Sequence, residues 1–409
     1  MAFEMATQNF RKDEFYVYDM ETIFWDERMP KVLSSRPAPL RWLAALALAL
    51  QAGLACGAVS AAAAADPANQ CRADLEDIAA FLPVNDSGAA DSLARRGADV
   101  ESALHQARTR AAAVTDAAAC DAVLKDYLHA WRPGHLSVSA LAPAGAAAPA
   151  AAGAGGDPRL PRLQLLGKDT LLLVLPSFKD RYQKPLEALL AAHRTELESH
   201  PYWIIDVRSN DGGSDLTYQG LLPWLLDGDY PEYRSAYLVT PANLRAQEQI
   251  CGLLSDPAAC TRMLAPAASA MRKAPAGSFV TVDGERFSIE RPAMREAKAP
   301  RRAAVLTDRD CGSSCDQFLL TVQTSFRVKL VGRPSAGVID YANLRPHPLP
   351  SGRQLRYAST RSTRLPDLPL DGIGVAPDIL LPAPQDAAAR DAEVGRVQRW
   401  LETGSWRMP

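Results

Sequence analysis

From Leu163 onward the chain alternates short apolar runs with amphipathic segments, and this alternation restricts its fold more than any other feature. The runs TLLLVLP, YWIIDVR, RRAAVLTD and FRVKLVG have the length and apolar character of buried strands. Segments between them, such as KPLEALLAAHRTELESH, TYQGLLPWLLDG and CDQFLLTVQTS, have the apolar spacing of helices. Strands that alternate with helices form parallel sheets. We therefore expect an α/β core, with ligand sites beyond the carboxyl ends of its strands.

Residues 231–300 interrupt this alternation. They predict a strand (SAYLVT), an Arg/Gln-rich helix around Cys251 and Cys260, and a hairpin, SFVTVDGERFSI, that turns at Asp283-Gly284. We interpret the segment as an insertion into the core. It is either a lid over one face or an ordinary packing layer.

The segments that precede the core differ from it in composition. Residues 66–141 predict a small helical domain, because apolar residues recur at spacings of three and four. Residues 142–158 are expected to form a flexible linker, since nearly all of them are Ala, Pro or Gly. The core then spans residues 159–385, and residues 386–409 form a C-terminal helix or tail.

The amino-terminal region is typical of a targeting sequence. Residues 42–65 carry no charge, end in small residues and follow Lys31, Arg36 and Arg41, which is the pattern of a secretory signal. We expect residues 29–65 to be a signal peptide that is cleaved near Ala65. Residues 1–28 do not fit this pattern, and we interpret them as a start-site artefact.

Two other interpretations of this region are less favoured. A membrane anchor would insert weakly, because Ala and Gly dominate the second half of the apolar run. A lipoprotein site at Cys56 would need a larger aliphatic residue than Gly53. We expect an exported protein, periplasmic or secreted, with no integral membrane span after cleavage.

The charge balance excludes one class of partner. The chain has 45 basic and 47 acidic residues, a net charge of −2. Dedicated binders of nucleic acid or of anionic membranes have a basic excess, so neither partner is expected.

Removal of the signal leaves an even number of cysteines, which favours disulfides in an exported protein. We expect a Cys71–Cys120 bridge that ties the ends of the helical unit, and a local Cys251–Cys260 bridge. No cluster of His or Cys has the spacing of a metal site, and neither a metal nor a cofactor is expected.

Two turns at predicted strand ends hold the residues that suit catalysis. In DVRSNDGGSD, Gly212 and Gly213 leave backbone N–H groups unshielded, which suits an oxyanion or a phosphate. In LTDRDCGSSCDQFLL, Ser313 or Ser314 is placed as a nucleophile at the start of a helix, although either could only cap that helix.

Cys311 and Cys315 flank these serines. Two cysteines four residues apart on a regular helix are poorly placed for a disulfide. Because Cys311 precedes the helix, a bridge between them remains open.

Five blocks in a fixed order resemble those of the C-terminal-processing (tail-specific) serine peptidases and of the related catalytic core of tricorn protease. They are LPSFKD, IIDVRSNDGGSD, VLTDRDCGSSCDQF, VKLVGRPSAG and DGIGVAPDI, between about Leu163 and Leu381. The resemblance implies a ClpP/crotonase-like peptidase core and hydrolysis of peptide amides without a cofactor. Many relatives carry a PDZ domain where this chain has only the linker, so capture of substrate carboxyl termini by that route is not expected.

The family pattern also assigns roles. Its nucleophile lies in a Ser-x-x-Glu pattern that opens a helix, and residues 313–316 match it with Asp316 at the acidic position. The resemblance therefore selects Ser313 over Ser314 as the nucleophile. It places the oxyanion site at the Gly212-Gly213 turn and at the backbone of Ser314.

The general base departs from the processing-protease branch, which uses a lysine soon after a Gly-x-Pro-Thr-x-Gly block. The matching block here ends at Gly337, and Val338 follows. The tricorn-like branch uses an upstream histidine and an acidic residue before Gly-Val-x-Pro-Asp, which implies His135 and Asp371. A serine needs an imidazole to accept its proton, and a carboxylate then orients the imidazole.

The expected protein is thus an exported serine peptidase that hydrolyses peptide or protein amides through an acyl-enzyme on Ser313. Two alternatives use the same core. One is a catalytically silent peptide-binding protein, motivated by the missing lysine and by aspartate in place of the usual glutamate at Asp371. The other is an esterase with the same triad.

Overall fold

The computed structural model describes residues 66–140, 157–253, 257–292 and 300–406. The predictions for the signal peptide and its preceding segment, and for most of the linker, lie outside the described residues. Within these described ranges, every helix is too short or too polar to cross a membrane.

A six-stranded sheet forms the centre of the core, in the order β13-β10-β9-β4-β3-β2. All neighbouring strands are parallel except β2 and β3. The α/β core predicted from the alternating pattern is therefore confirmed. The strands are β2 (Arg162–Leu166), β3 (Thr170–Val174), β4 (Tyr202–Asp206), β9 (Arg302–Thr307), β10 (Val328–Gly332) and β13 (Ile379–Leu380).

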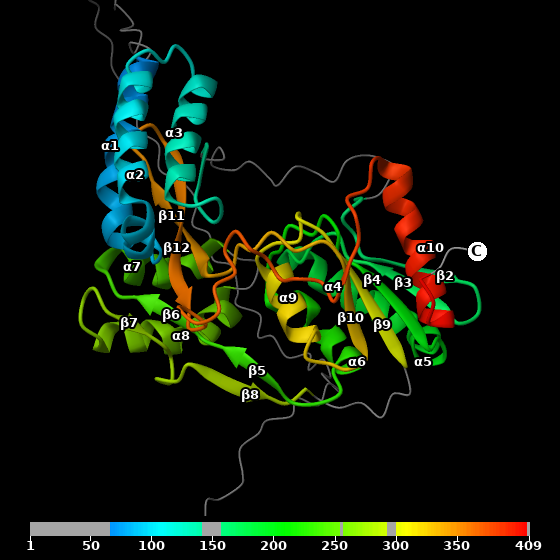
Figure 1. Ribbon diagram of the computed structural model, residues 1–409. Coiled ribbons are helices and arrows are strands. Elements are labelled where there is room, and N and C mark those ends of the chain that lie inside the picture. Colours follow the sequence, from blue (N-terminus) through cyan, green and yellow to red (C-terminus); the bar gives the residue numbers. More distant parts are fainter. Residues whose placement is uncertain (1–65, 141–156, 254–256, 293–299, 407–409) are drawn as a thin grey trace, which may run out of the picture. The chain divides into compact units, whose positions relative to one another are not determined.

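Helices cover both faces of this sheet, because successive strand residues point to opposite sides. Leu171, Leu173 and Ile205 pack with α4 to α6 and α9, whereas Leu172 and Ile204 pack with α10. Figure 1 shows α10 at one face of these strands. The helices are α4 (Gln183–Ala192), α5 (Arg194–Ser199), α6 (Leu222–Leu225), α9 (Ser314–Val322) and α10 (Ala387–Thr403), and a 3₁₀ turn η1 (Asp180–Tyr182) precedes α4.

Two predicted helices are less regular than their sequences indicate. The long amphipathic helix is divided into α4 and α5 at His193, whose ψ of 25° leaves the helical range. The segment after the Gly212-Gly213 turn is mostly a 3₁₀ helix, η2 (Asp215–Leu221), and only its end is the α-helix α6.

A second sheet is antiparallel, in the order β1-β12-β6-β7, with β11 also paired to β12. The β11–β12 hairpin was not predicted from the sequence. The strands are β1 (Ser137–Ala140), β6 (Ser235–Leu238), β7 (Phe279–Val280), β11 (Tyr341–Pro348) and β12 (Arg353–Ser362).

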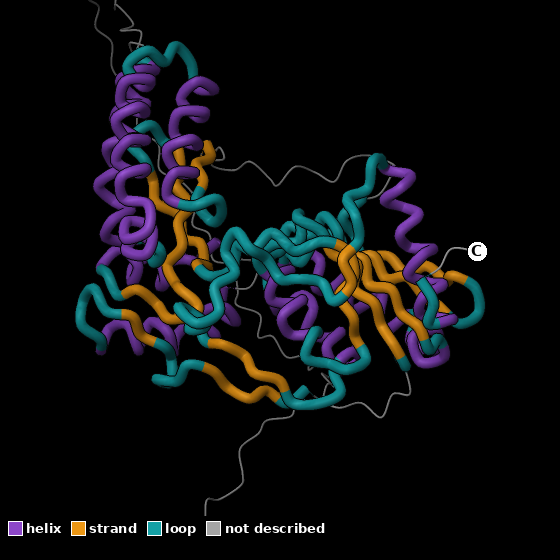
Figure 2. Tube along the Cα trace, viewed as in Figure 1, coloured by secondary structure: helices purple, strands orange, loops and turns teal. Residues whose placement is uncertain are grey.

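The three amino-terminal helices pack on this second sheet. Leu355 and Tyr357 of β12 belong to the same apolar cluster as the buried faces of the helices, and Figure 2 shows the helices beside these strands. The predicted Cys71–Cys120 disulfide is present. The helices are α1 (Pro67–Asn85), α2 (Ala89–Ala111) and α3 (Ala117–Trp131).

The segment predicted as an insertion contributes strands to two different sheets. β7 pairs with β6, while β8 (Phe287–Glu290) pairs with β5 (Tyr230–Tyr233). The predicted hairpin between the two arms is therefore wrong. Gly284 does turn the chain, with φ of 82°. The strands on its two sides, β7 and β8, pair with β6 and β5 respectively and not with each other.

The helical part of this segment is divided where a single helix was predicted. Helices α7 (Pro241–Gln249) and α8 (Pro257–Lys273) flank a 3₁₀ turn, η3 (Ile250–Leu253). The predicted Cys251–Cys260 disulfide links this turn to α8.

Candidate active site

The structure brings the two predicted turns together at one edge of the parallel sheet. β4 and β9 are parallel neighbours, so the loops that follow them meet. A methyl group on Gly212 would lie 2.9 Å from Ser313 Cβ and 2.4 Å from the carbonyl oxygen of Gly312. Only glycine allows the two loops to approach this closely.

Ser313 is the N-cap residue of α9 and has φ of 59° and ψ of −119°. A non-glycine residue at positive φ costs about 1–2 kcal/mol, and such strain persists only where the surroundings hold it. A serine on a sharp turn from strand to helix is the arrangement of a nucleophile elbow. We name residues 311–315 the nucleophile turn.

Asp316 ties the nucleophile turn to the loop after β10. The carboxylate is completely buried. Its Oδ2 accepts hydrogen bonds from the backbone N–H groups of Ser313 (2.8 Å) and Val338 (3.0 Å). Its Oδ1 accepts from the N–H of Gly337 (3.1 Å) and from the hydroxyl of Ser335. The acidic position of the Ser-x-x-Asp pattern therefore holds the backbone of Ser313 in place.

A disulfide links the two ends of the nucleophile turn. Cys311 and Cys315 are both fully buried and are joined, with Cα atoms 5.3 Å apart. The bridge forms because Cys311 precedes α9 rather than lying on it. The question left open by the spacing is resolved in favour of a bond.

The two glycines differ in what their N–H groups do. The N–H of Gly212 donates to Oδ1 of Asn210 at 2.9 Å. The N–H groups of Gly213 and Ser314 donate to no acceptor within the described ranges. These two groups remain free to bind an oxygen of a ligand.

His135 lies in a turn just before β1 and also has a positive φ, 56°. Its Nδ1 donates to the carbonyl oxygen of Tyr341 at 2.5 Å, which leaves Nε2 as a proton acceptor. Burial lowers the pKa of His135 below 6.5, the hydrogen bond to Tyr341 opposes this change, and the charge of Arg132 adds to it. The imidazole is therefore neutral at neutral pH.

The turns of His135 and Ser313 both pack against Val338. A methyl group on Gly134 would lie 2.3 Å from Val338 Cγ1, and one on Gly312 would lie 2.9 Å from Val338 Cγ2. Among the described residues, no hydrogen bond joins the His135 ring to the hydroxyl of Ser313. Catalytic hydrogen bonds in free enzymes often tighten only when substrate binds.

Asp371 contacts backbone groups rather than the imidazole. Its Oδ1 accepts from the N–H groups of Ile339 and Asp340, both at 2.8 Å. In return, the carboxylate of Asp340 accepts from the N–H of Asp371 at 2.9 Å. Burial raises the pKa of Asp371 to about 6. The structure thus brings Asp371 to the segment that leads into Tyr341 and does not pair it with His135.

Comparison with known proteins agrees with this geometry. Residues 169–381, more than half of the chain, match the pattern of peptidase family S41. The chain belongs to peptidase family S41. It is therefore a serine-type peptidase, and the family resemblance seen in the sequence is confirmed. No curated protein sequence matches the chain.

Solved structures show the same fold. The S41 chain matches the crystal structure of mature CPAF with a TM-score of 0.55 and 13% identity, over 84% of this chain and 99% of that one. It matches a CPAF point mutant with a TM-score of 0.59 and 12% identity, over 82% and 97%. It matches mature CPAF complexed with lactacystin with a TM-score of 0.56 and 14% identity, over 82% and 97%. The ClpP/crotonase-like core is thus the fold of this S41 peptidase.

Two residues at the candidate site were not predicted from the sequence. Asn210 is completely buried. Its side-chain NH₂ group donates to the backbone carbonyl of Leu175 at 2.8 Å, and its backbone carbonyl accepts from the N–H of Gly312 at 3.1 Å. Tyr341 contributes its backbone carbonyl to His135. Asn210 lies inside a conspicuous block, but its partners are backbone groups of the loops that follow β3 and β9. A carbonyl acceptor has no signature in a sequence.

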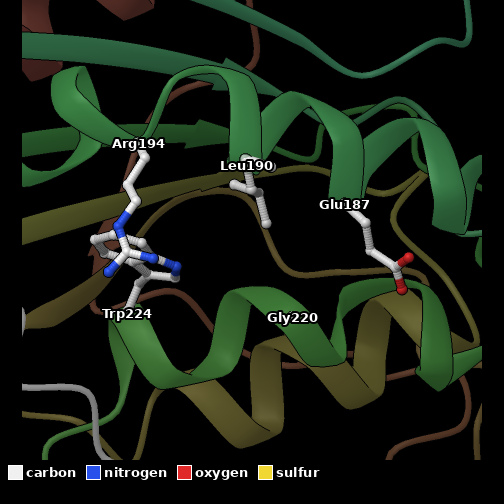
Figure 3. A pocket seen from close by; sticks show the side chains of 6 residues that line it. Glu187, Leu190, Arg194, Gly220 and Trp224 are labelled. Carbon is white, nitrogen blue, oxygen red and sulfur yellow. The ribbon is translucent and has the colours of Figure 1, made fainter. Parts of the chain in front are cut away.

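A cavity of about 220 Å³ lies between α4 and α6 and is separate from this candidate site. In Figure 3, Glu187 and Leu190 point from α4 towards the segment that carries Gly220. None of the predicted catalytic residues lines it; its lining residues are Glu187, Leu190, Ala191, Arg194, Gly220 and Trp224. The described residues also contain no group of three or more His, Cys, Asp or Glu side chains that could hold a metal ion.

Proposed function

We propose that the chain is an exported serine peptidase that hydrolyses peptide or protein amides through an acyl-enzyme on Ser313. The proposal rests above all on the nucleophile turn. Ser313 has a strained backbone at the N-terminus of α9 and lies against Gly212 beyond the carboxyl ends of parallel strands. Two N–H groups, those of Gly213 and Ser314, have no protein acceptor among the described residues.

The reaction follows from these groups. His135 takes the proton of Ser313 through Nε2 as Oγ bonds to the carbonyl carbon of the substrate. The carbonyl oxygen becomes an oxyanion, which accepts hydrogen bonds from the N–H groups of Gly213 and Ser314. His135 then protonates the leaving amine. Water, deprotonated by the same imidazole, releases the acyl group.

Asp371 acts in this scheme as a positioning residue. Its carboxylate fixes the backbone of residues 339–340, and the next carbonyl, that of Tyr341, holds Nδ1 of His135. The carbonyl keeps the imidazole in the tautomer that can accept a proton at Nε2. The carbonyl of Tyr341 carries less negative charge than a carboxylate, which is the partner that the family pattern implies for the imidazole.

Export is supported by the signal-like amino-terminal sequence and by the disulfides. All six cysteines of the described residues are paired. Disulfides persist in the periplasm and outside cells and are rare in the cytosol.

Labelling with a fluorophosphonate probe tests the proposed mechanism. We expect the protein with its disulfides intact to be labelled, and Ser313→Ala and His135→Ala to lose labelling. A matched control is His347→Ala, since His347 is also partly buried and bonded, here to Asp77, but lies at the opposite end of β11 from Tyr341. We expect this control to keep labelling. Hydrolysis of a peptide amide and of its ester then identifies the bond class.

Two results would contradict the proposal. Labelling that persists in Ser313→Ala would place the nucleophile elsewhere. A folded wild-type protein with all three disulfides that is neither labelled nor able to cleave peptides would exclude the mechanism.

The rate of labelling should depend on pH in a defined direction. Only neutral His135 can accept a proton, so the rate rises as the pH passes upward through the pKa of His135. Because burial lowers that pKa, we expect the midpoint below pH 6.5 and a flat rate from pH 7 to 8. Labelling rates measured from pH 4.5 to 8.5, with circular dichroism as a check of folding, give the midpoint. A midpoint above 6.5 would show that the base is not this buried imidazole.

A further inference from the structure

Arg132 lies at the end of α3 and forms a buried ion pair that the proposed mechanism does not use. Its guanidinium contacts both carboxylate oxygens of Asp86, with Nη1 at 2.5 Å from Oδ1 and Nη2 at 2.7 Å from Oδ2. The side chains of Arg132 and Asp86 are only 5% and 1% exposed. Such paired contacts fix the plane of a guanidinium group.

Asp86 is itself held rigidly in the connection between α1 and α2. Its Oδ1 accepts from the N–H of Gly88 at 2.9 Å, and its Oδ2 accepts from the N–H of Ala358 on β12 at 3.1 Å. The carboxylate therefore joins the amino-terminal helices to the second sheet and provides a fixed anchor for Arg132.

The remaining donors of Arg132 hold the turn that carries His135. Nε donates to the carbonyl of Gly134 at 3.0 Å, and Nη2 donates to the carbonyl of His135 at 3.3 Å. His135 has a positive φ, which costs free energy unless its neighbours enforce it. The bonds from Arg132 supply part of that enforcement.

The same guanidinium also contacts Tyr341, whose carbonyl binds the imidazole. The guanidinium carbon of Arg132 lies 5.1 Å from the centre of the Tyr341 ring, and the Tyr341 hydroxyl donates to Asp91 at 2.7 Å. Two groups determine where the imidazole lies: the backbone of His135 and Tyr341, the partner of Nδ1. The buried guanidinium of Arg132 contacts both of them.

We propose that Arg132 is a positioning residue for the general base: anchored on Asp86, it holds the backbone of residues 134–135 and so sets where the imidazole of His135 lies. This inference rests on the proposed role of His135. It also gives the amino-terminal helices a part in catalysis, because they supply both members of the ion pair.

Charge provides a second readout of this arrangement. The charged groups that act on the imidazole are Arg132 after α3, Asp86 in the α1–α2 connection and Asp316 on α9. Arg132 lowers the pKa of His135, whereas the two carboxylates raise it. Arg132 has a larger effect on the pKa of His135 than Asp86 has, so neutralising both groups should raise that pKa.

The test uses three variants, because loss of Arg132 alone would leave Asp86 as an unpaired buried charge. The neutral pair Asp86→Asn/Arg132→Gln removes both charges and the paired contacts. Arg132→Lys keeps the charge but not the planar fork of donors. The matched control Asp74→Asn/Arg353→Gln neutralises another buried pair between α1 and β12 that does not contact His135.

We expect the plateau rate of fluorophosphonate labelling to fall tenfold or more in the neutral pair and in Arg132→Lys, since small displacements of a base reduce rates strongly. The labelling midpoint should rise in the neutral pair and stay near the wild-type value in Arg132→Lys. The control pair should change neither quantity. A neutral pair that folds and keeps both the wild-type plateau and midpoint would overturn the inference.

A measurement that needs no activity separates this inference from the proposed function. In a Ser313→Ala background, NMR titration of the His135 ring protons reports its pKa with and without the neutral pair. A raised midpoint supports the placement by Arg132, and an unchanged midpoint together with an unchanged labelling plateau overturns it. Absence of labelling in the wild type, by contrast, would contradict the proposed function alone.

Discussion

Asp316→Ala is expected to remove nearly all peptidase activity and to lower the free energy of unfolding by about 3 kcal/mol or more. The substitution leaves three N–H groups without their acceptor, that of Gly337, which is buried, and those of Ser313 and Val338, which are partly buried. Each buried donor without a partner costs about 1–3 kcal/mol. With its anchor lost, Ser313 moves, and a displacement of about 1 Å reduces a rate on the order of a hundredfold.

Asp316→Asn offers an intermediate case that makes the prediction sharper. The side-chain oxygen of Asn can take the Oδ2 position and keep the bonds from Ser313 and Val338. Its NH₂ group then lies against Ser335 and Gly337. Because an NH₂ group cannot accept a hydrogen bond here, the N–H of Gly337 loses its acceptor. We expect a loss of about 1–3 kcal/mol and a smaller fall in activity than for Asp316→Ala.

Urea unfolding and the fluorophosphonate labelling rate of the folded fraction measure both effects. Asp378→Ala is a suitable control, because Asp378 accepts from a single backbone N–H, that of Leu330, and is partly exposed. We expect it to change the labelling rate little. If folded Asp316→Ala is labelled at the wild-type rate, the nucleophile turn does not depend on this carboxylate.

The sequence predicted the parts of this site that depend on local pattern. Ser313, Gly212 and Gly213 lie at strand ends whose apolar runs are easily recognised, and a parallel sheet necessarily brings such ends to one edge. Family resemblance added the choice of Ser313 over Ser314. The disulfides Cys71–Cys120 and Cys251–Cys260 followed from spacing, because each closes a compact local unit.

The contacts around His135 depend instead on pairings between distant segments. His135 meets Tyr341 across more than two hundred residues, through a β11–β12 hairpin that the pattern analysis missed. The residues of this hairpin include charged side chains and prolines, so the alternation typical of strands is weak. The backbone contacts of Asp371 were not predicted for the same reason, because its partners Ile339 and Asp340 lie just before that hairpin.

Gly212→Ala is expected to reduce acyl-enzyme formation by a hundredfold or more. A methyl group at this position would lie 2.4 Å from the carbonyl of Gly312, 2.9 Å from Ser313 Cβ and 3.1 Å from the N–H nitrogen of Ser314. Real Cβ atoms do not approach backbone atoms so closely, so either the Gly212 turn or the nucleophile turn must shift. Both outcomes move the nucleophile relative to the N–H groups proposed to bind the oxyanion.

Gly167→Ala separates this steric effect from backbone strain. Gly167, in the turn between β2 and β3, has φ of 84°, close to the 79° of Gly212, but a methyl group there would meet no atom within 4 Å. Both substitutions place alanine at positive φ and should cost about 1–2 kcal/mol of stability for that reason. Only Gly212→Ala should also slow labelling of Ser313.

Labelling rates and urea unfolding of the two variants, measured side by side, decide the matter. A large loss of activity in Gly212→Ala with a stability close to that of Gly167→Ala would localise the effect to the approach of the two loops. Equal activity in both variants would show that the close contact between Gly212 and the nucleophile turn is not needed for catalysis. The proposed oxyanion site would then have to be formed by other N–H groups.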